Sequence, residues 1–444
     1  MPNSLFGTDG ARGVANDDLT CELAYRLGMG AVSCLGPRIV VGRDTRRSGT
    51  MLESALVAGI MAAGGEPACC GVIPTPAVAL ITREEHADGG VVISASHNPP
   101  EYNGIKFFGP DGMKASDEVE DALADFAATG WEHQQFGTGE HVGSLRKLKL
   151  AREAYINHAI ASIDVDLTGL TIAVDCAHGA SCRTTPAALE RLGARVHAIN
   201  TDFDGMDINV GCGSTHLDAV RKLVAETGAD IGLAHDGDAD RVLFVDAAGE
   251  EVDGDKVLAI CARDLAERGE LAEGEVVSTV MCNMGLTRAM DELGISVAQT
   301  PVGDRFVLQR MLADGAVLGG EQSGHIIFLR HNSTGDGLVT ALQLLAVMKR
   351  TGRSLADLAR VMHRYPQSLV NVRTPRKAEW EGNEFIARAI VQGDESLAGD
   401  GRILVRASGT EPLVRVMVEA ATEELAEGVA QGIASVVREQ LDGE

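Results

Sequence analysis

The sequence is short of positive charge and of aromatic side chains, and both shortages exclude classes of function. Its 39 lysine and arginine residues stand against 64 aspartate and glutamate residues, which gives a formal net charge of -25. A surface of this sign repels nucleic acid and anionic membranes, so neither is expected as a partner. Aromatic residues make up only 4% of the chain, so base-stacking platforms for single-stranded nucleic acid are not expected either.

The motifs of several common sites are also missing. The nine cysteines include no C-x-x-C pair, which predicts reduced thiols in a cytoplasmic protein and not a zinc site or a disulfide framework. No signal-peptide pattern is visible at the start, and the most apolar predicted helix, near Leu338–Met348, is too short to cross a bilayer. The P-loop, G-x-G-x-x-G and H-E-x-x-H patterns do not occur, which argues against NTPases, dinucleotide enzymes and zinc proteases.

Short apolar segments followed by glycine-rich or polar turns recur along the chain. They are Pro37–Val41 before Gly42-Arg43-Asp44-Thr45-Arg46, Gly90–Ile93 before Ser94–Pro99, Leu170–Val174 before Asp175–Gly179, and Ile231–Ala234 before Asp236. This alternation of strand, turn and helix predicts layered α/β domains. In such domains, ligands gather at the loops beyond the carboxyl ends of the strands.

Domain boundaries are indicated by polar stretches at Thr129–Gly143, Ala247–Gly249 and His363–Pro366. A length of 444 residues suggests three or four domains at about 100–200 residues each. We predict domains over residues 1–149, 150–247, 248–365 and 366–444. The last combines short strands with a charged amphipathic helix over Thr422–Gln440, which is typical of a smaller α+β unit.

The segment Asp236-Gly237-Asp238-Ala239-Asp240-Arg241 is a candidate metal site. Three carboxylates at alternate positions after an apolar strand offer the hard oxygen ligands that Mg²⁺ prefers. An EF-hand also begins Asp-x-Asp-x-Asp, but Arg241 stands at its sixth position and Ala247 at its twelfth, so that interpretation fails. An acidic surface turn is the alternative.

Ser96 is a candidate nucleophile and phosphate carrier. It follows an apolar strand, in a turn that Asn98 and Pro99 favour. A Ser-His-Asp hydrolase is disfavoured because no G-x-S-x-G elbow occurs in the chain. Lys106, at the start of the predicted strand Ile105–Phe108, could stabilise charge or move a proton nearby. A plain polar turn and a solvated edge-strand lysine are the alternatives for these two residues.

Two glycine-containing turns carry embedded arginines and are candidate phosphate cradles. The first is Gly7–Gly13 with Arg12, and the second is Arg406–Pro412 with Arg415 beyond it. Free backbone N–H groups and guanidinium forks bind phosphate well, although glycine-rich turns also occur without any ligand. In so acidic a chain, the second cluster favours phosphate binding over a structural turn.

A further loop, Gly320-Glu321-Gln322-Ser323-Gly324-His325, collects a carboxylate, an amide, a hydroxyl and an imidazole. These are groups that hydrogen-bond to sugar hydroxyls. The loop is therefore a candidate sugar-recognition site, whereas His325 taken alone is more often a structural histidine.

Together these segments resemble the α-D-phosphohexomutase superfamily, in order and spacing, from Phe6 to Arg415. Within it, Phe6–Gly13, Ser94–His97 and Gly319–His325 look most like the bacterial phosphoglucosamine mutase family. Departures are small: Ala407 stands where the family often has Pro or Lys, and Cys282 where it often has Ser. The resemblance implies three related mixed α/β domains and a smaller α+β C-terminal domain around one cleft.

The resemblance also implies a role for each matched residue. Ser96 would be the phosphoserine, and Asp236, Asp238 and Asp240 would hold Mg²⁺ together with its phosphate. Arg12, Lys106 and Arg241 would surround the transferring group. Glu321, Ser323 and His325 would face the sugar, and either Lys106 or His325 would assist proton transfer. Arg406, Ser408, Gly409, Thr410 and Arg415 would hold the non-reacting phosphate.

The implied reaction interconverts glucosamine 6-phosphate and glucosamine 1-phosphate through glucosamine 1,6-bisphosphate, for UDP-N-acetylglucosamine and peptidoglycan synthesis. The expected partner is a hexosamine phosphate, and a homodimer is one assembly left open. Three rivals remain at this point: a phosphomannomutase or phosphoglucomutase, a metal-dependent phosphatase with a phosphoserine intermediate, and a sugar-phosphate-binding protein without turnover.

Overall fold

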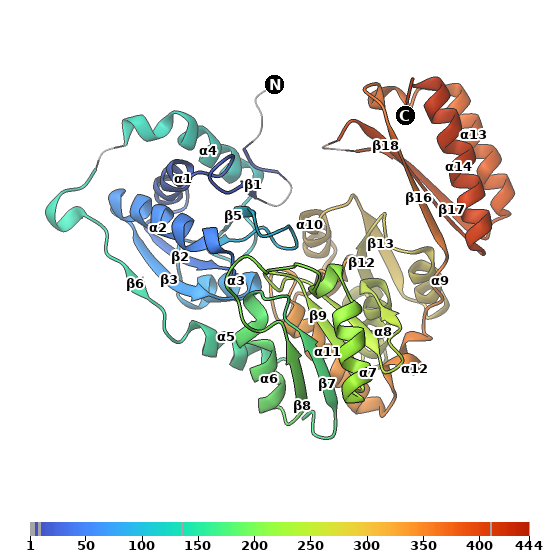
Figure 1. The fold of residues 1–444 in the computed structure, drawn as a ribbon, viewed down its shortest axis with the longest axis horizontal. Coiled ribbons are helices and arrows are strands. Elements are labelled where there is room, and N and C mark those ends of the chain that lie inside the picture. Colours follow the sequence, from blue (N-terminus) through green and yellow to red (C-terminus); the bar gives the residue numbers. More distant parts are fainter. Residues whose placement is uncertain (1–4, 8–9, 135, 409–410, 444) are drawn as a thin grey trace. The chain divides into compact units, whose positions relative to one another are not determined.

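The protein is represented by a computed structural model that describes residues 5–7, 10–134, 136–408 and 411–443. It contains two compact units (Figure 1). Unit 1 comprises Met1–Met281 and Gly294–Val361, and unit 2 comprises Cys282–Leu293 and Met362–Glu444. Within the described residues, no helix is both long enough and apolar enough to cross a membrane.

The first sheet of unit 1 has the strand order β1-β5-β4-β2-β3-β6. Only β5 runs against the other strands, because it pairs antiparallel with both β1 and β4. The strands are β1 (Ala11–Val14), β2 (Arg38–Arg43), β3 (Glu66–Val72), β4 (Gly89–Ile93), β5 (Tyr102–Phe108) and β6 (Arg146–Lys147), with helices α1 (Cys21–Cys34), α2 (Arg47–Ala62), α3 (Thr75–Glu84) and α4 (Asp117–Ala128). A buried apolar core that includes Leu27, Leu56 and Phe107 fixes the ends of these strands.

The second sheet has the order β11-β10-β9-β7-β8. Its strands are β7 (Thr171–Asp175), β8 (Arg195–Ile199), β9 (Ile231–His235), β10 (Val242–Asp246) and β11 (Glu251–Val252), with helices α5 (Ala151–Ile160), α6 (Thr185–Arg191) and α7 (Asp218–Thr227). β9 is buried along its whole length and pairs antiparallel with β10, with His235 opposite Val242. This pairing closes the Asp-rich segment 236–241 into a tight connection.

The third sheet has the order β13-β12-β14-β15. Its strands are β12 (Glu275–Thr279), β13 (Ser296–Thr300), β14 (Leu318–Gly320) and β15 (Ile326–Phe328), with helices α8 (Gly254–Glu267), α10 (Asp304–Asp314), α11 (Gly337–Thr351) and α12 (Leu355–Ala359). Gly320 pairs with Ile326, so residues 321–325 form the connection of the β14–β15 hairpin. The apolar helix predicted near Leu338–Met348 is the buried α11.

Unit 2 has an antiparallel sheet of order β16-β18-β17. It contains β16 (Gln367–Arg373), β17 (Gly401–Ala407), β18 (Leu413–Ala420), α13 (Glu384–Leu397), α14 (Glu423–Gln440) and α9 (Met284–Glu292). α14 begins where its N-cap Thr422 accepts a hydrogen bond from the Leu425 amide. The small α+β unit expected at the end of the chain is therefore confirmed.

One helix of unit 2 comes from a distant part of the sequence. Buried Glu419 of β18 accepts hydrogen bonds from the amide of Met284 at 2.9 Å and from Asn283 Nδ2 at 3.2 Å, at the start of α9. Arg402 pairs with the same carboxylate at 3.0 Å. The anchor ties α9 to the C-terminal sheet, which the order of elements along the chain does not predict.

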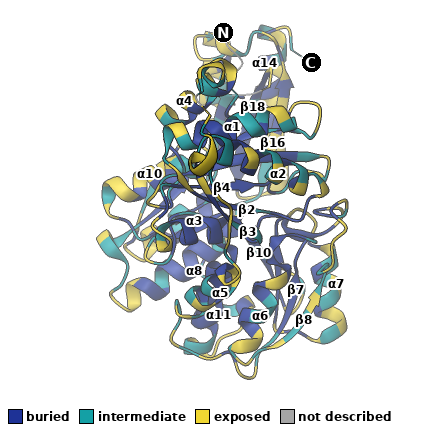
Figure 2. Cartoon of the chain, turned by 90° about the vertical axis from the view of Figure 1, so that its left-hand side faces the viewer, coloured by how far each residue is buried: buried dark blue, intermediate teal, exposed yellow. Residues whose placement is uncertain are grey.

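The mixed sheets and the final antiparallel sheet confirm the predicted α/β class. Figure 2 shows the central strands β2, β4 and β10 coloured mainly as buried, and the exposed class mainly on loops and outer helix faces. Loops at the ends of such strands are held on a rigid scaffold, which suits them to carry function.

Candidate active site

Three connecting loops of unit 1 meet around Ser96. The loop after β4 carries Ser96, whose Oγ donates to Asp236 Oδ2 at 2.6 Å in the loop after β9. The loop after β14 carries His325, whose Nδ1 lies 3.5 Å from Asp240 Oδ2. Residues from three separate sheets therefore share one site, in agreement with the expectation that strand-end loops carry the chemistry.

Ser96 itself is buried and has an unusual backbone. Its φ is 52°, in the left-handed region that residues with a β-carbon seldom adopt. Its amide donates to Ser94 Oγ at 2.9 Å, and the Asn98 amide closes the turn on the Ala95 carbonyl at 3.1 Å. Backbone conformations of this kind persist only where the surroundings hold them, and they concentrate at functional sites.

The three aspartates after β9 form a compact set of oxygen donors. Asp236, Asp238 and Asp240 are all buried, and their ligand atoms lie within 4.8 Å of one another. One oxygen of Asp238 and one of Asp240 are buried and find no hydrogen-bond partner among the residues that the structure describes. Burial, followed by the neighbouring Asp240 and Asp238 charges, raises the pKa of Asp236 well above its ordinary value. Carboxylates crowded in this way call for a cation between them.

Cationic side chains stand beside these carboxylates. Lys106 Nζ lies 3.6 Å from Asp238 Oδ2 and 3.7 Å from Asp240 Oδ2. Arg241 Nε lies 3.8 Å from Asp240 Oδ1. Burial alone would raise the pKa of Asp240, but Lys106, His325 and Arg241 together hold it well below its ordinary value.

Arg12 reaches the same region from β1, where it pairs with Gly104 of β5. A β-carbon at Gly104 would lie 2.4 Å from the Ser94 carbonyl and 3.0 Å from the Arg12 side chain. Only glycine therefore lets β5 pass so close to the serine loop. Burial lowers the pKa of Arg12, while the Asp238 and Asp240 charges oppose that shift.

The ring of His325 has a defined hydrogen-bonding arrangement. Its Nε2 accepts a hydrogen bond from the Gly335 amide at 3.1 Å, so the neutral ring carries its proton on Nδ1, toward Asp240. Burial works against the charged ring, but the hydrogen bond and charge of Asp240 raise the pKa of His325 overall. Protonation of Nε2 would oppose the Gly335 N–H, so it requires that amide to move.

The hairpin loop with Glu321 presents its polar groups in two directions. Glu321 Oε1 accepts from the Gly303 amide at 3.2 Å, and Ser323 Oγ donates to Glu321 Oε2 at 3.4 Å. Gln322 Nε2 instead donates to Asp253 at 3.3 Å, the residue that caps α8. Gln322 thus stabilises the fold, and Glu321 and Ser323 form the polar pair of the loop.

The second arginine cluster lies in unit 2. Arg406 of β17 and Arg415 of β18 are directly opposite one another, which places two like charges on one face of the sheet. Burial, followed by the Arg415 charge, lowers the pKa of Arg406. Ser408 Oγ accepts from the Glu411 amide at 3.2 Å, whereas Gly409 and Thr410 lie outside the described residues. An anion between the arginines would relieve their repulsion.

The structure adds residues that sequence reasoning did not select. Thr75, at the start of α3, donates to Asp238 Oδ2 at 2.6 Å. His97 Nδ1 lies 3.3 Å from both Ser96 Oγ and Arg241 Nη1; burial, then Arg241 and Arg12, lower its pKa to about 4. In unit 2, Lys377 donates to the carbonyls of Ser408 and Glu411. Only adjacency to Ser96 could have indicated His97 from sequence.

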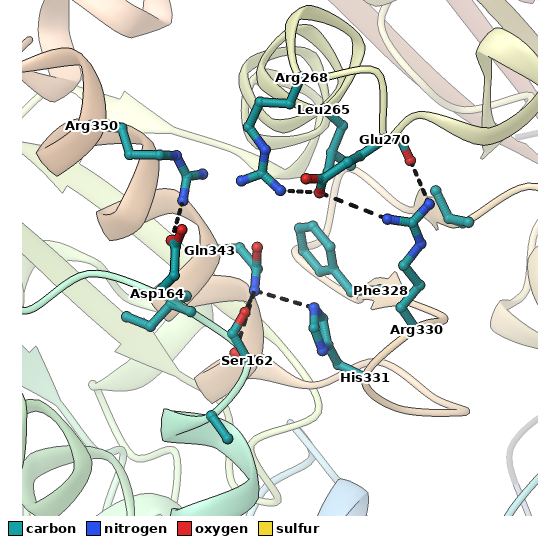
Figure 3. A pocket seen from close by; sticks show the side chains of 13 residues that line it. Ser162, Asp164, Leu265, Arg268, Glu270, Phe328, Arg330, His331, Gln343 and Arg350 are labelled. Carbon is teal, nitrogen blue, oxygen red and sulfur yellow. Dashed lines mark hydrogen bonds and ion pairs between the residues drawn. The ribbon is translucent and has the colours of Figure 1, made fainter.

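A separate cavity of about 280 Å³ in unit 1 contains several arginines (Figure 3). Arg350 lies 3.3 Å from Asp164, Arg330 lies 3.7 Å from Glu270, and Arg268 pairs with Glu270 as well. Carboxylates therefore balance these cations, in contrast to the opposed arginines of unit 2.

Comparison with known families gives matches along nearly the whole chain. Models of phosphoglucomutase/phosphomannomutase α/β/α domains I, II and III match residues 3–133, 153–249 and 253–365, and the C-terminal domain model matches residues 369–436. A phosphoglucosamine mutase from Clostridium novyi is 50% identical over 99% of each chain. Another, from Symbiobacterium thermophilum, is 52% identical over 99% of this chain and 100% of its own.

The chain belongs to the phosphoglucosamine mutase family. The predicted resemblance to the wider phosphohexomutase superfamily is thereby confirmed. Among solved structures, a phosphoglucomutase/phosphomannomutase family protein from Burkholderia thailandensis superposes with a TM-score of 0.81 at 25% identity, covering 98% of this chain and 97% of its own. An N-acetylphosphoglucosamine mutase from Aspergillus fumigatus, in complex with GlcNAc-6P and magnesium, gives 0.72 at 18% identity over 98% and 96%; this second likeness concerns the fold.

Proposed function

We propose that this enzyme interconverts glucosamine 6-phosphate and glucosamine 1-phosphate, using Ser96 as the phosphoryl carrier. The observation that carries the proposal is the 2.6 Å hydrogen bond from Ser96 Oγ to Asp236, within a buried group of three aspartates. Phosphoglucosamine mutases at about half identity over the full chain support the substrate.

The Asp236, Asp238 and Asp240 side chains would hold Mg²⁺, with a phosphoserine oxygen on Ser96 as a further ligand. Their fit rests on the unpartnered buried oxygens of Asp238 and Asp240 and on an all-oxygen donor set. When bound, the ion supplies positive charge that neutralises a transferring phosphoryl group. A related structure in complex with magnesium is consistent with this choice of metal.

In the proposed cycle, the bond between phosphorus and phosphorylated Ser96 Oγ breaks as phosphorus forms a bond to the sugar oxygen O1 of glucosamine 6-phosphate. The proton of O1 leaves to a base, Ser96 Oγ takes up a proton, and glucosamine 1,6-bisphosphate results. The bisphosphate then turns over, and the bond between phosphorus and O6 breaks as a new bond to Ser96 Oγ forms. Ser96 gives up its proton, O6 takes one up, and glucosamine 1-phosphate is released. Such transfer depends mainly on positioning and charge neutralisation.

The chain's own cations would supply the remaining stabilisation. Arg12, Lys106 and Arg241 would surround the transferring group, because each lies among the acidic side chains beside Ser96. Proton transfer would fall to Lys106 or to His325, whose Nδ1 is 3.5 Å from Asp240. Both are buried, which limits the contact of either group with bulk water.

Substrate binding would use two groups of residues. Arg406, Ser408, Gly409, Thr410 and Arg415 would hold the non-reacting phosphate, and Glu321, Ser323 and His325 would bind the sugar. The opposed Arg406 and Arg415 support the first assignment, since a phosphate accepts two guanidinium forks at once. The same cradle must serve both orientations of the bisphosphate.

A comparison of initial rates tests the proposal. Glucosamine, glucose and mannose 6-phosphates are supplied separately with Mg²⁺, while inorganic phosphate release and the intact mass of the protein are followed. We expect the highest kcat/KM for glucosamine 6-phosphate, almost no phosphate release, and one added phosphoryl group on Ser96. Faster turnover of glucose or mannose phosphate would reassign the substrate, and stoichiometric phosphate release would indicate a phosphatase.

A further inference from the structure

An arginine outside the reaction scheme lies directly behind the serine loop. Arg46 follows β2 and precedes α2, in the turn Gly42–Arg46 that the sequence predicts after a strand and that no step of the proposed reaction uses. It is only 1% exposed and is the largest of the fully buried side chains. A buried arginine must satisfy its donors and its charge locally.

The two terminal nitrogens of Arg46 donate their hydrogen bonds to the serine loop and the start of β5. Its Nη2 donates to the carbonyls of Ser96 at 2.9 Å and Asn98 at 2.7 Å. Its Nη1 donates to the carbonyl of Tyr102 at 3.0 Å and also to that of Pro99. One planar guanidinium thus fixes four backbone carbonyls between residues 96 and 102.

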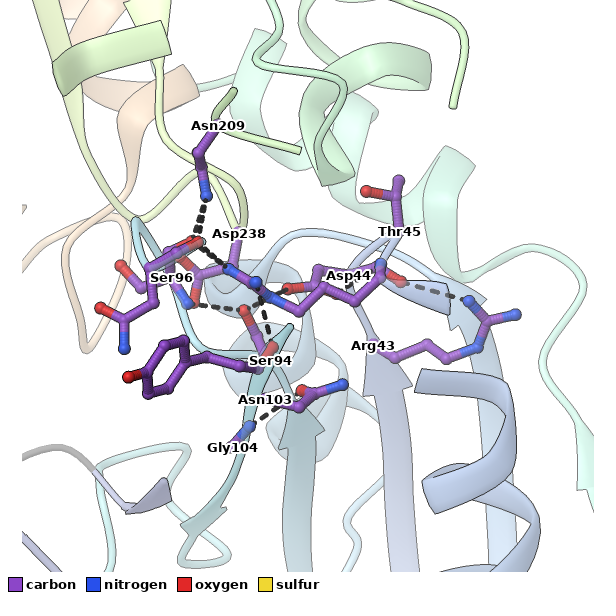
Figure 4. A network of polar contacts seen from close by, with 12 residues as sticks. Arg43, Asp44, Thr45, Ser94, Ser96, Asn103, Gly104, Asn209 and Asp238 are labelled. Atoms are coloured by element: carbon purple, nitrogen blue, oxygen red, sulfur yellow. Dashed lines mark hydrogen bonds and ion pairs between the residues drawn. The ribbon is translucent and has the colours of Figure 1, made fainter. Parts of the chain in front are cut away.

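The carboxylate that neutralises Arg46 holds the other side of Ser96. Asp44 Oδ2 accepts from Arg46 Nε at 2.9 Å and from Ser94 Oγ at 2.7 Å. Ser94 Oγ in turn accepts from the Ser96 amide at 2.9 Å. Figure 4 shows Asp44 and Ser94 beside Ser96 in this network. The Asp44–Arg46 pair therefore restrains both the N–H and the carbonyl of Ser96.

A second donor reaches the same carbonyls from the segment between β8 and β9. Asn209 Nδ2 donates to Ser96 O at 2.9 Å and to Asn98 O at 3.1 Å. The Arg46 turn is itself anchored to that segment, because the Arg47 amide donates to the Gly205 carbonyl at 3.0 Å. Thr45 Oγ1 also donates to the His178 carbonyl at 2.6 Å, in the loop after β7. Arg46 and Asn209 thus hold the loop from two elements.

We propose that Arg46 is a positioning residue that, with Asn209, holds Ser96 in its left-handed backbone conformation with Oγ directed at Asp236. The inference rests on the proposed function of Ser96. A phosphoryl carrier must return its oxygen to the same place in both half-reactions, and misplacement by about 1 Å can cost about 100-fold in rate. Lysine cannot replace the guanidinium, because its three donors do not form the planar fork.

The test compares R46K with R43K, a matched control three residues earlier, at the end of β2. Arg43 is half-buried, pairs with Glu53 at 2.9 Å and donates to the main-chain carbonyl of Asp44 at 3.2 Å. It does not touch the Asp44 carboxylate that binds Arg46 and Ser94, and its side chain points away from Ser96 in Figure 4. We expect R46K to lower kcat per phosphorylated enzyme about 100-fold, with KM for glucosamine 6-phosphate within about threefold of wild type, since Arg46 binds no part of the substrate. R43K should keep wild-type kcat. A folded R46K protein with kcat within about threefold of R43K overturns the proposal.

A second variant covers the case in which R46K does not fold. Asn209 has a φ of 62°, so Asn209→Gly removes the amide without straining the backbone. We expect about a tenfold loss of kcat with KM and Tm nearly unchanged. Wild-type kcat in N209G would contradict the proposal, whether or not R46K folds.

The positioning role and the substrate can be scored separately. Loading of unphosphorylated Ser96 from glucose 1,6-bisphosphate, followed by intact mass, measures phosphoryl transfer without any glucosamine phosphate. R46K should load slower than R43K and wild type. Wild-type protein that loads but does not turn over glucosamine 6-phosphate would refute the substrate and leave the positioning role standing. Equal loading rates in R46K and R43K would refute the positioning role alone.

Discussion

The two regions proposed to bind phosphate, around Ser96 and around Arg406 and Arg415, carry opposite charge. Around Ser96 in unit 1, the buried carboxylates of Asp236, Asp238 and Asp240 lie close together, and two of their oxygens find no hydrogen-bond partner among the described residues. In unit 2, Arg406 and Arg415 face one another on the neighbouring strands β17 and β18, and Arg415 pairs with Glu411 at 3.1 Å. The first arrangement needs a cation and the second needs an anion.

This contrast explains how so acidic a chain can bind a phosphorylated sugar. The acidic region around Ser96 would attract phosphate only with a metal ion bound. The Arg406–Arg415 pair of unit 2 carries positive charge without a metal. Substrate phosphate should therefore bind to unit 2 residues with little dependence on Mg²⁺, and transfer should depend on Mg²⁺ strongly.

Removal of the carrier oxygen should have the largest effect. Ser96→Ala leaves the aspartates and cations in place but removes the only atom proposed to bear the phosphoryl group. We expect turnover to fall by at least about four orders of magnitude, with Tm close to that of wild type. Peptide mapping of active wild-type protein should place phosphate on Ser96. Normal turnover by the variant, or phosphate found only elsewhere, would end the assignment.

Replacement of one metal ligand should come next. Asp238→Asn keeps the size of a side chain that already accepts from Thr75 but removes a charged ligand. We expect kcat to fall about 100- to 1,000-fold at limiting Mg²⁺, with substrate affinity nearly unchanged. Asp230→Asn, at an exposed carboxylate that accepts a hydrogen bond from the Thr171 amide at 2.8 Å, is the control. An equal loss of substrate affinity in Asp238→Asn would break the comparison between the two regions.

Truncation in unit 2 should affect binding in both directions of the reaction. Arg415→Ala removes one of the two opposed guanidinium groups. The loss of its charge-assisted hydrogen bond should lower kcat/KM about 10- to 100-fold. The loss should be the same for glucosamine 6-phosphate and glucosamine 1-phosphate, because one cradle serves both orientations. Arg388→Ala on the exposed face of α13 is the control. A loss confined to one substrate would refute the shared cradle.

The sequence predicts these two regions to different extents, for physical reasons. Ser96, Lys106 and the three aspartates are recognisable because chemistry-bearing residues there sit in contiguous segments directly after apolar strands. Arg46 and Asn209 act through long-range contacts to backbone carbonyls, with separations of 50 and 113 residues from Ser96. No local pattern encodes such a contact. The same limit hides the attachment of α9 to Glu419, 135 residues away.

The sequence predicts the ends of most strands and helices to within about two residues, because apolar segments alternate along the chain with turn-forming residues. The strand expected at Ile231–Ala234, for example, is β9 (Ile231–His235), and the helix expected over Thr422–Gln440 is α14 (Glu423–Gln440). The domain boundaries and the individual roles of the site residues stay predictions, which the variants above address.

Acid should lower the stability of the folded protein through His235, which lies beside the reaction centre. This buried histidine precedes Asp236, its Nε2 lies 3.0 Å from Thr185 Oγ1, and burial lowers its pKa to about 4 from 6.5. As the pH falls, His235 is protonated in the unfolded chain before it is protonated in the folded chain. Its contribution to the free energy of unfolding is therefore complete above pH 6.5 and is lost as the pH drops toward 4. The shift corresponds to about 3 kcal/mol. Unfolding by urea from pH 7.5 to 4.5 should show this loss, and His235→Gln should flatten it. An unchanged pH slope in the variant would contradict the assignment to His235.

The choice of an amino sugar should depend on one charge in unit 1 and is the smallest effect expected. Glu321 accepts from Gly303 and Ser323 and is the acidic side chain of the proposed sugar loop. A carboxylate favours an ammonium at C2 over a hydroxyl because a charge-assisted hydrogen bond is about twice as strong as a neutral one. Glu321→Gln keeps the acceptor but removes the charge.

We therefore expect E321Q to lower kcat/KM for glucosamine 6-phosphate about tenfold, with little change for glucose 6-phosphate. Q322M is the matched control in the same loop, because the Gln322 amide is bonded to Asp253 and turns toward α8. That variant should keep the preference for the amino sugar. If E321Q slows both sugars equally, Glu321 acts on the loop's shape and not on the amine, and selectivity must come from another residue of the site.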